Sequence, residues 1–165
     1  SKIALMGASH GSLISVLTAA KDPRVKALVL AYGVMDIYRW WDHLVATNQV
    51  GHDEITVRTY GEGPDDHPQS FRIRNAVDVV KAINCPVLIL QGAKDTIVPP
   101  DQATIMEQAL NKAGKSCQTE IYPDCLHGFL VYAPYLTKDV TAAEKQQTEQ
   151  AWRTTWQFLS KVLGG

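Results

Sequence analysis

The 165-residue sequence contains little cysteine, little excess charge of either sign and no long apolar run. Its 3 cysteines are too few for a disulfide framework, and none has the C-x-x-C spacing of zinc and redox sites. The 16 Lys and Arg nearly balance the 17 Asp and Glu, so there is no electrostatic footprint for a nucleic acid. No apolar run reaches the roughly 18 residues that a membrane span needs. We therefore expect neither a nucleic-acid partner nor a membrane partner.

Two of the three cysteines lie at the starts of predicted strands. Cys85 and Cys117 each open a predicted strand and could be neighbours at one end of a sheet. A bridge between them is one alternative, and buried free thiols are the other, which we favour.

Four short apolar runs predict strands. They are Lys2–Met6, Lys26–Tyr32, Pro86–Gln91 and Gln118–Tyr122. The second and third are rich in Val, Leu and Ile without polar interruption, which is typical of strands buried on both faces of a parallel sheet. The first follows directly on Ser1, so the N-terminus predicts a core strand and not a secretory signal.

Stretches with helical spacing lie between and after these runs. Helices are expected over Ser12–Ala20 and Gln102–Ala113, and a third begins at the capping box Thr141-Ala-Ala-Glu144. The third places Trp152, Trp156 and Leu159 on one stripe. Alternating strands and helices predict an α/β fold, with a mainly parallel, doubly wound sheet of about four strands and helices on both faces.

The segment from Asp36 to Asn84 is longer than one crossover helix requires. It contains a Trp pair, the Gly- and Pro-rich stretch YGEGPDDHP, and the histidines His43, His52 and His67. We expect two or three short helices with loops over one end of the sheet, forming a lid-like insertion at about 36–84.

One motif carries nucleophile chemistry. Residues 7–11 read GASHG and lie directly after a predicted strand and directly before a predicted helix. This context is the one that a G-x-S-x-G nucleophile elbow requires, because the tight turn accepts only small residues two positions either side of the serine. The alternative is a glycine-rich turn that packs closely or binds an anion at the helix N-terminus.

A serine hydroxyl needs a base, and the base needs an acid. Asp95 follows the strand PVLIL, and His127 follows the strand QTEIY, so both lie at carboxyl ends of strands in the chain order Ser, Asp, His. Asp95 alone could be a turn former, as could His127 beside its glycine. Asp36 and Asp124 are rival acids.

The remaining candidates are weaker. The backbone N–H of His10 would be one oxyanion donor. Tyr38, Trp40 and Trp41 either bind substrate near the serine or form only the apolar face of a lid helix. The three histidines of the 36–84 segment lie beside aspartates but lack the spacing of a metal site, so we expect neither a metal nor an organic cofactor.

On these residues the sequence resembles the α/β-hydrolases, and among them the catalytic domain of the prolyl oligopeptidase family, especially its acylaminoacyl-peptidase and dipeptidyl-peptidase-like branches. The resemblance rests on GASHG, DPRVKALVLAYGVMD, YGEGPDDHPQSFRIRNAVDVVKAINCPVLILQGAKDTIVPPDQA and YPDCLHGF. It implies that Ser9 is the nucleophile, Asp95 the acid and His127 the base.

The sequence departs from that family in two ways. Ser12 follows Gly11 where the peptidases usually have a second glycine, a change that the related esterases tolerate more readily. The family's domain also begins well before the elbow, so the resemblance implies that residues 1–165 are the C-terminal part of the fold. The first strand would then have one bare edge, completed by a missing N-terminal half or a partner chain.

The sequence therefore predicts a serine hydrolase that cleaves an amide or ester bond. The resemblance favours a peptidase acting on short peptides, with a carboxylesterase of the same fold as the alternative. A non-catalytic α/β binding module is the alternative from another class.

Overall fold

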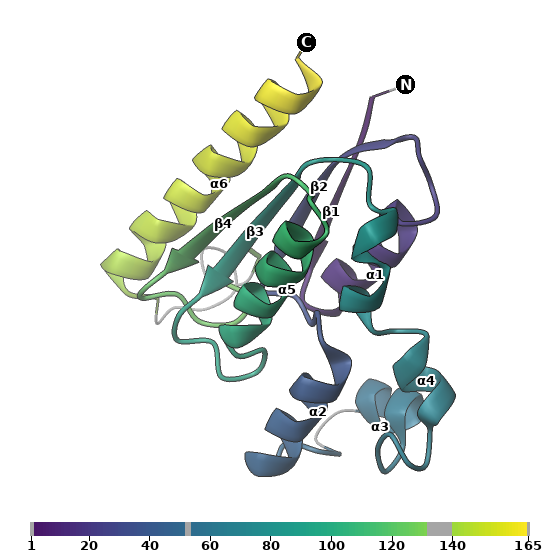
Figure 1. Ribbon diagram of the computed structural model, residues 1–165. Helices are drawn as coiled ribbons and strands as arrows, with labels where there is room; N and C mark the ends of the chain where they lie inside the picture. The colour runs from purple at the N-terminus through teal and green to yellow at the C-terminus, as the bar shows by residue number, and fades with distance from the viewer. Residues whose placement is uncertain (1, 52–53, 132–139, 165) are drawn as a thin grey trace.

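The computed structural model describes residues 2–51, 54–131 and 140–164, and its centre is a four-stranded parallel sheet (Figure 1). The strands are β1 (Ile3–Ala8), β2 (Val25–Ala31), β3 (Val87–Gly92) and β4 (Cys117–Tyr122). They lie side by side in chain order, and all three pairings are parallel. Each strand starts and ends within two residues of its prediction. Because all four strands are parallel, their carboxyl ends meet at one edge of the sheet.

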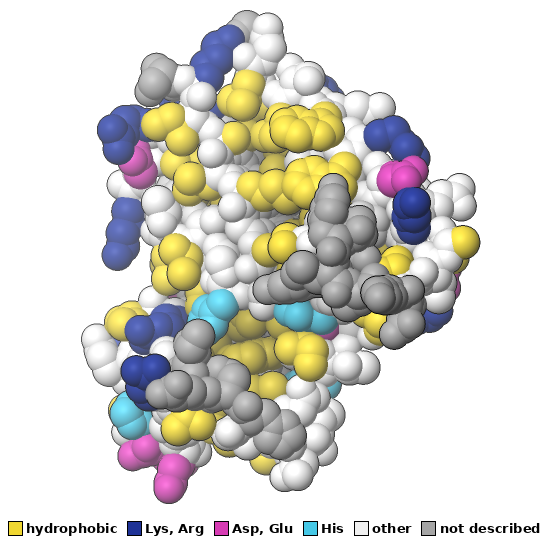
Figure 2. All heavy atoms as spheres, turned by 180° about the vertical axis from the view of Figure 1, so that it is seen from behind, with side chains coloured by type: hydrophobic (Ala, Val, Ile, Leu, Met, Phe, Trp, Pro, Cys, Tyr) yellow, Lys and Arg dark blue, Asp and Glu magenta, His cyan; other side chains and the backbone are white. Residues whose placement is uncertain are grey.

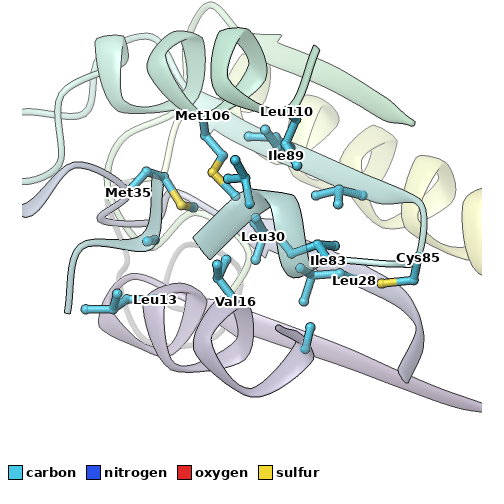
Figure 3. Packing of buried hydrophobic residues seen from close by; sticks show 14 of the residues in the cluster. Leu13, Val16, Leu28, Leu30, Met35, Ile83, Cys85, Ile89, Met106 and Leu110 are labelled. Carbon is cyan, nitrogen blue, oxygen red and sulfur yellow. The ribbon is translucent and has the colours of Figure 1, made fainter. Parts of the chain in front are cut away.

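Helices cover both faces of the sheet, as expected for the fold class. On one face lie α1 (His10–Ala19), the 3₁₀ helix η1 (Ala76–Ala82) and α5 (Asp101–Lys112); on the other lies α6 (Ala142–Leu163). Figure 3 shows Leu30 and Ile89 of the sheet among Leu13, Val16 and Met106 of the helices. Burial on both faces explains the uninterrupted apolar runs of β2 and β3.

Three further helices lie between β2 and η1. They are α2 (Ile37–Ala46), α3 (Glu54–Tyr60) and α4 (Pro68–Arg72), and in Figure 1 they lie beyond the carboxyl end of the sheet. They share an apolar cluster of their own, which includes Trp40, Trp41, Tyr60 and Phe71. The η1 helix, in contrast, contributes Ala76 and Val80 to the core of the sheet.

Helix α6 begins as its capping box predicts, with one difference. The Thr141 hydroxyl accepts the backbone N–H of Glu144 at 3.1 Å. The Glu144 carboxylate, however, accepts the backbone N–H of Leu126 at 3.3 Å. The predicted stripe is confirmed for Trp152 and Trp156, whose rings stack at 6.1 Å, although Trp156 is 61% exposed. Apolar side chains, including aromatic rings, gather on the face of the molecule that Figure 2 shows, which is opposite to the face seen in Figure 1.

The edges and thiols of the sheet also bear on the sequence predictions. Within the described residues β1 pairs with β2 alone, which leaves its other edge open.

Cys85 and Cys117 are free thiols, and burial raises the pKa of each. None of the helices described here is long and apolar enough to cross a membrane.

A tight turn joins β1 to α1. A Cβ on Gly7 would lie 2.3 Å from the carbonyl oxygen of Gly11, so no side chain fits there. A Cβ on Gly11 would meet nothing within 4 Å, so the expected steric need for glycine on both sides holds only for Gly7. Ser12, the departure noted above, donates its hydroxyl to the carbonyl oxygens of Gly7 at 2.8 Å and Ala31 at 3.1 Å.

The Ser12 side chain occupies space left by another glycine. A Cβ on Gly33 would lie 2.3 Å from the Ser12 Cβ. The absence of a side chain at residue 33 thus lets the serine lie buried beneath the turn.

The two glycines of the turn give the first testable prediction. We expect Gly7→Ala to lower the free energy of unfolding by several kcal/mol, because its Cβ meets backbone that cannot move aside without opening the turn. Gly11→Ala, at a helical position with open space, should leave it unchanged or raise it by up to about 1 kcal/mol. Urea denaturation followed by circular dichroism measures both, and equal destabilisation by the two variants would contradict the steric argument.

Candidate active site

Ser9 occupies the turn between β1 and α1 with a backbone conformation that non-glycine residues rarely adopt. Its φ is 53° and its ψ is −126°. It lies at the N-cap of α1, yet its hydroxyl makes no capping hydrogen bond, unlike most serines in that place. Its backbone N–H donates to the carbonyl oxygen of Ala31 at 2.9 Å, which ties the turn to the end of β2. The hydroxyl is thereby held above the sheet and free for another partner.

That partner is His127, in the loop after β4. The His127 Nε2 lies 3.0 Å from the Ser9 Oγ, and its Nδ1 lies 2.7 Å from the Asp95 Oδ2. Because a carboxylate only accepts, the Nδ1 carries the imidazole proton and the Nε2 is left to accept the serine O–H. The structure thus brings together all three residues that the sequence singled out, in the arrangement that nucleophilic catalysis by serine requires.

Asp95 is buried, with 3% of its surface exposed, and its carboxylate is surrounded by donors. The Oδ1 accepts the backbone N–H groups of Ile97 at 3.0 Å and Val98 at 2.8 Å. The Oδ2 accepts from His127 and, at 3.2 Å, from the side-chain amide of Gln91. A buried carboxylate is costly unless it is hydrogen-bonded, so this ring of donors compensates for the burial of Asp95 and fixes its orientation.

Close backbone packing places the acid loop against the histidine loop. A Cβ on Gly92 would lie 2.3 Å from the carbonyl oxygen of Cys125, so this approach depends on glycine. The N–H of Ala93 donates to the Tyr122 carbonyl at 2.9 Å, and the N–H of Lys94 donates to the Cys125 carbonyl at 3.1 Å. These contacts fix the distance between the loops that contain Asp95 and His127.

The two rival acids have other partners. The Asp36 carboxylate caps α2, where it accepts the backbone N–H groups of Tyr38 and Arg39, both at 3.1 Å. Asp124 pairs with Lys94 at 2.7 Å and accepts from Gln147 at 2.8 Å. The hydrogen bonds from Lys94 and Gln147 hold the pKa of Asp124 below its usual range.

His10 is the first residue of α1, so its backbone N–H is at the positive end of the helix dipole, beside Ser9. Its side chain turns to the insertion: the Nε2 lies 2.7 Å from the phenol oxygen of Tyr60, and the two rings stack at 5.7 Å. Tyr60 is fully buried, and burial raises its pKa, so the phenol stays neutral.

The three aromatic candidates of α2 have different neighbours. The Trp40 ring lies edge-on to that of His10, at 6.2 Å, and its indole N–H donates to the Ile97 carbonyl at 3.0 Å. Trp41 and Tyr38 both pack on Phe71, at 5.5 Å between ring centroids. Trp40 and Trp41 are 6% and 5% exposed, whereas Tyr38 is 40% exposed. Among the hydrogen bonds of the described residues, the bond from Trp40 is the one that joins these three side chains to the loop of Asp95.

The other described histidines, His43 and His67, have structural partners, and a thiol, Cys125, lies nearby. His43 Nε2 lies 2.8 Å from the Thr96 carbonyl, His67 lies 3.2 Å from Asp66, and His52 is outside the described residues. Among the residues that the structure describes, no three His, Cys, Asp or Glu side chains are grouped to hold a metal. Burial raises the pKa of Cys125 to about 12, so this thiol is not a competing nucleophile.

Sequence reasoning missed several residues around the site. Gln91 and Gln102 are both fully buried, and Gln102 accepts the backbone N–H groups of Met35 at 2.8 Å and Asp36 at 2.9 Å. Tyr60 was also missed. The available signal was a polar residue closing the apolar run PVLILQ, which marks Gln91 as a buried amide in need of partners.

Comparison with known proteins adds evidence independent of this geometry. Residues 1–163 match the dienelactone hydrolase family. A protein of Salmonella typhimurium named "Putative carboxymethylenebutenolidase" is 28% identical over 128 residues, which are 78% of this chain and 37% of the relative. The acylamino-acid-releasing enzyme 2 of Oryza sativa subsp. japonica is 27% identical over 139 residues, covering 77% of this chain and 17% of that enzyme.

Solved structures share the fold. The acylaminoacyl peptidase of Pyrococcus horikoshii superimposes with a TM-score of 0.77 at 16% identity, over 99% of this chain and 24% of that one. The chain thus spans well under half the length of these relatives. The match along residues 1–163, together with the parallel sheet and its flanking helices, establishes that the chain belongs to the dienelactone hydrolase family of α/β-hydrolases.

Proposed function

We propose that this chain hydrolyses carboxylic acyl bonds, with Ser9 as nucleophile, His127 as general base and acid, and Asp95 as the group that orients the imidazole. The observation that supports this proposal most strongly is the continuous hydrogen-bonded chain from Ser9 Oγ through His127 to the buried Asp95. Each member comes from the end of a different strand, so the arrangement is set by the sheet and not by one flexible loop.

The reaction follows from the positions of these groups. The Ser9 oxygen attacks the carbonyl carbon while its proton passes to His127 Nε2, and the Asp95 carboxylate stabilises the imidazolium. The His10 N–H and the helix N-terminus are placed to stabilise the oxyanion of the tetrahedral intermediate. The intermediate collapses, the leaving group takes the proton from His127, and water then hydrolyses the acyl-enzyme by the same steps.

Carboxylic esters, including lactones, are the first substrate class in this proposal. The family matched by residues 1–163 is named for a lactone, which is a cyclic ester. An ester also makes the smaller chemical demand, because its carbonyl has less resonance stabilisation than that of an amide, and an alkoxide or enolate leaves more readily than an amide anion. Helices α2 to α4 act in this proposal as the insertion that bounds the substrate, with Tyr38, Trp40 and Trp41 as its aromatic side chains.

Short acylated peptides are the second candidate, which the resemblance in the sequence favoured. A specific observation supports it, since the Oryza sativa relative is named for release of acylamino acids. Comparing p-nitrophenyl acyl esters with N-acylated amino acid p-nitroanilides, using the whole protein that contains this chain, separates the two classes. A higher kcat/KM for the ester favours the first candidate, and a higher kcat/KM for the anilide favours the second.

The role of Ser9 gives a prediction for either substrate class. Ser9→Ala should lower kcat by about 10⁴-fold or more while leaving the unfolding midpoint close to that of the wild type, because only the attacking oxygen is lost. A folded Ser9→Ala protein that keeps its rate would contradict the assignment of the nucleophile. A folded wild-type protein that turns over neither substrate would favour a non-catalytic binding module.

The choice of acid gives a separate prediction with a matched control. Asp95→Asn should lower kcat by about 10⁴-fold, because an amide favours the wrong imidazole tautomer. Asp124→Asn, three positions before His127 but paired with Lys94, should change kcat by less than about threefold. Steady-state kinetics on the preferred ester measures both, and a larger loss in Asp124→Asn than in Asp95→Asn would overturn the assignment.

A further inference from the structure

Gln91 is a polar residue inside the apolar core of the sheet. It is the fifth residue of β3, and its side chain is fully buried. Its amide nitrogen lies within hydrogen-bond distance of three acceptors: the Val98 carbonyl at 3.1 Å, the Gly92 carbonyl at 3.2 Å and the Asp95 Oδ2 at 3.2 Å. The donor end of the amide is therefore directed at the acid and its loop.

The Gln91 contact falls on a particular oxygen of Asp95. The Oδ2 that accepts from Gln91 is the oxygen that accepts from His127 Nδ1 at 2.7 Å, whereas Oδ1 is occupied by two backbone N–H groups. Two donors on one oxygen share its negative charge. The Gln91 amide therefore reduces the charge that Asp95 presents to the imidazole and fixes the rotation of the carboxylate.

The acceptor end of the same amide also supports this orientation, in which the donor end is directed at Asp95. Within the part of the chain that the structure describes, the buried Gln91 Oε1 has no hydrogen-bond partner. Reversing the amide would turn this oxygen toward the Asp95 carboxylate and the Val98 carbonyl, which is repulsive. The amide is thus held in one orientation by its donor contacts.

We propose that Gln91 is a positioning residue that sets the basicity of His127 through Asp95, and so sets the lowest pH at which the site is active. This inference rests on the proposed function. Removing the Gln91 donor leaves more charge on Oδ2, which stabilises the protonated imidazole. The imidazole then stays protonated, and unable to accept the serine proton, up to a higher pH.

The surroundings of His127 contain other groups that titrate or carry charge. Besides Asp95 and Ser9, they are Tyr32 at the end of β2, Lys94 paired with Asp124, the buried Cys125, and Glu144 of α6, which accepts the Leu126 N–H. None of these groups hydrogen-bonds to the Gln91 side chain in the described residues, so they are common to the wild type and the variants.

The test compares two buried glutamines. Gln91→Met should move the acid limb of the kcat/KM profile to higher pH by about 0.5 unit or more. Gln102→Met, which removes an equally buried amide that contacts Met35 and Asp36, should leave the limb in place. Gln91→Leu is the second variant, since it removes the amide donor with a side chain of similar size, and it should shift the limb in the same direction.

A second readout separates this inference from the proposed function. The NMR titration of the His127 imidazole needs no turnover, and its midpoint should rise by the same amount in both Gln91 variants. An unchanged midpoint in both, or an equal shift in Gln102→Met, would overturn the role of Gln91. Absence of turnover in the wild type would instead contradict the proposed function, while the NMR comparison would still decide the inference.

Discussion

The site depends on backbone hydrogen bonds that continue the parallel ladder beyond the end of each strand. The N–H of Ser9 donates to Ala31 at 2.9 Å, that of Tyr32 to Leu90 at 2.7 Å, and that of Ala93 to Tyr122 at 2.9 Å. Each bond joins the loop after one strand to the end of the next. These bonds fix the loops relative to one another, so residues that are distant in sequence meet at the carboxyl edge of the sheet.

Burial of the acid is the second constraint, and it explains much of the surrounding structure. A carboxylate removed from water needs donors, and Asp95 obtains them from its own loop, from His127 and from Gln91. The loop is braced in turn by α2, through the Trp40 indole on the Ile97 carbonyl. The segment beyond the sheet edge therefore supports the electrostatics of the site, whatever it contributes to substrate binding.

Local sequence patterns were enough to predict the sheet and the residues Ser9, Asp95 and His127, because both follow from short stretches of adjacent residues. Apolar runs mark β2 and β3, and a strand followed by GASHG marks the turn at Ser9. What could not be predicted depends on distant partners. The Tyr60 phenol meets His10 across 50 positions, and Gln102 meets Met35 across 67. Helical spacing alone also cannot tell that Trp156 lies past the edge of the core.

In the proposed site, Ser9 acts as a nucleophile that His127 activates. The most direct test of this role is treatment of the whole folded protein with a fluorophosphonate, followed by mass spectrometry of the proteolytic peptides. One equivalent of phosphonyl group should be found on Ser9, and His127→Ala should label far more slowly. An adduct on another residue, or an unlabelled Ser9 in the folded wild-type protein, would contradict the role of Ser9 as nucleophile.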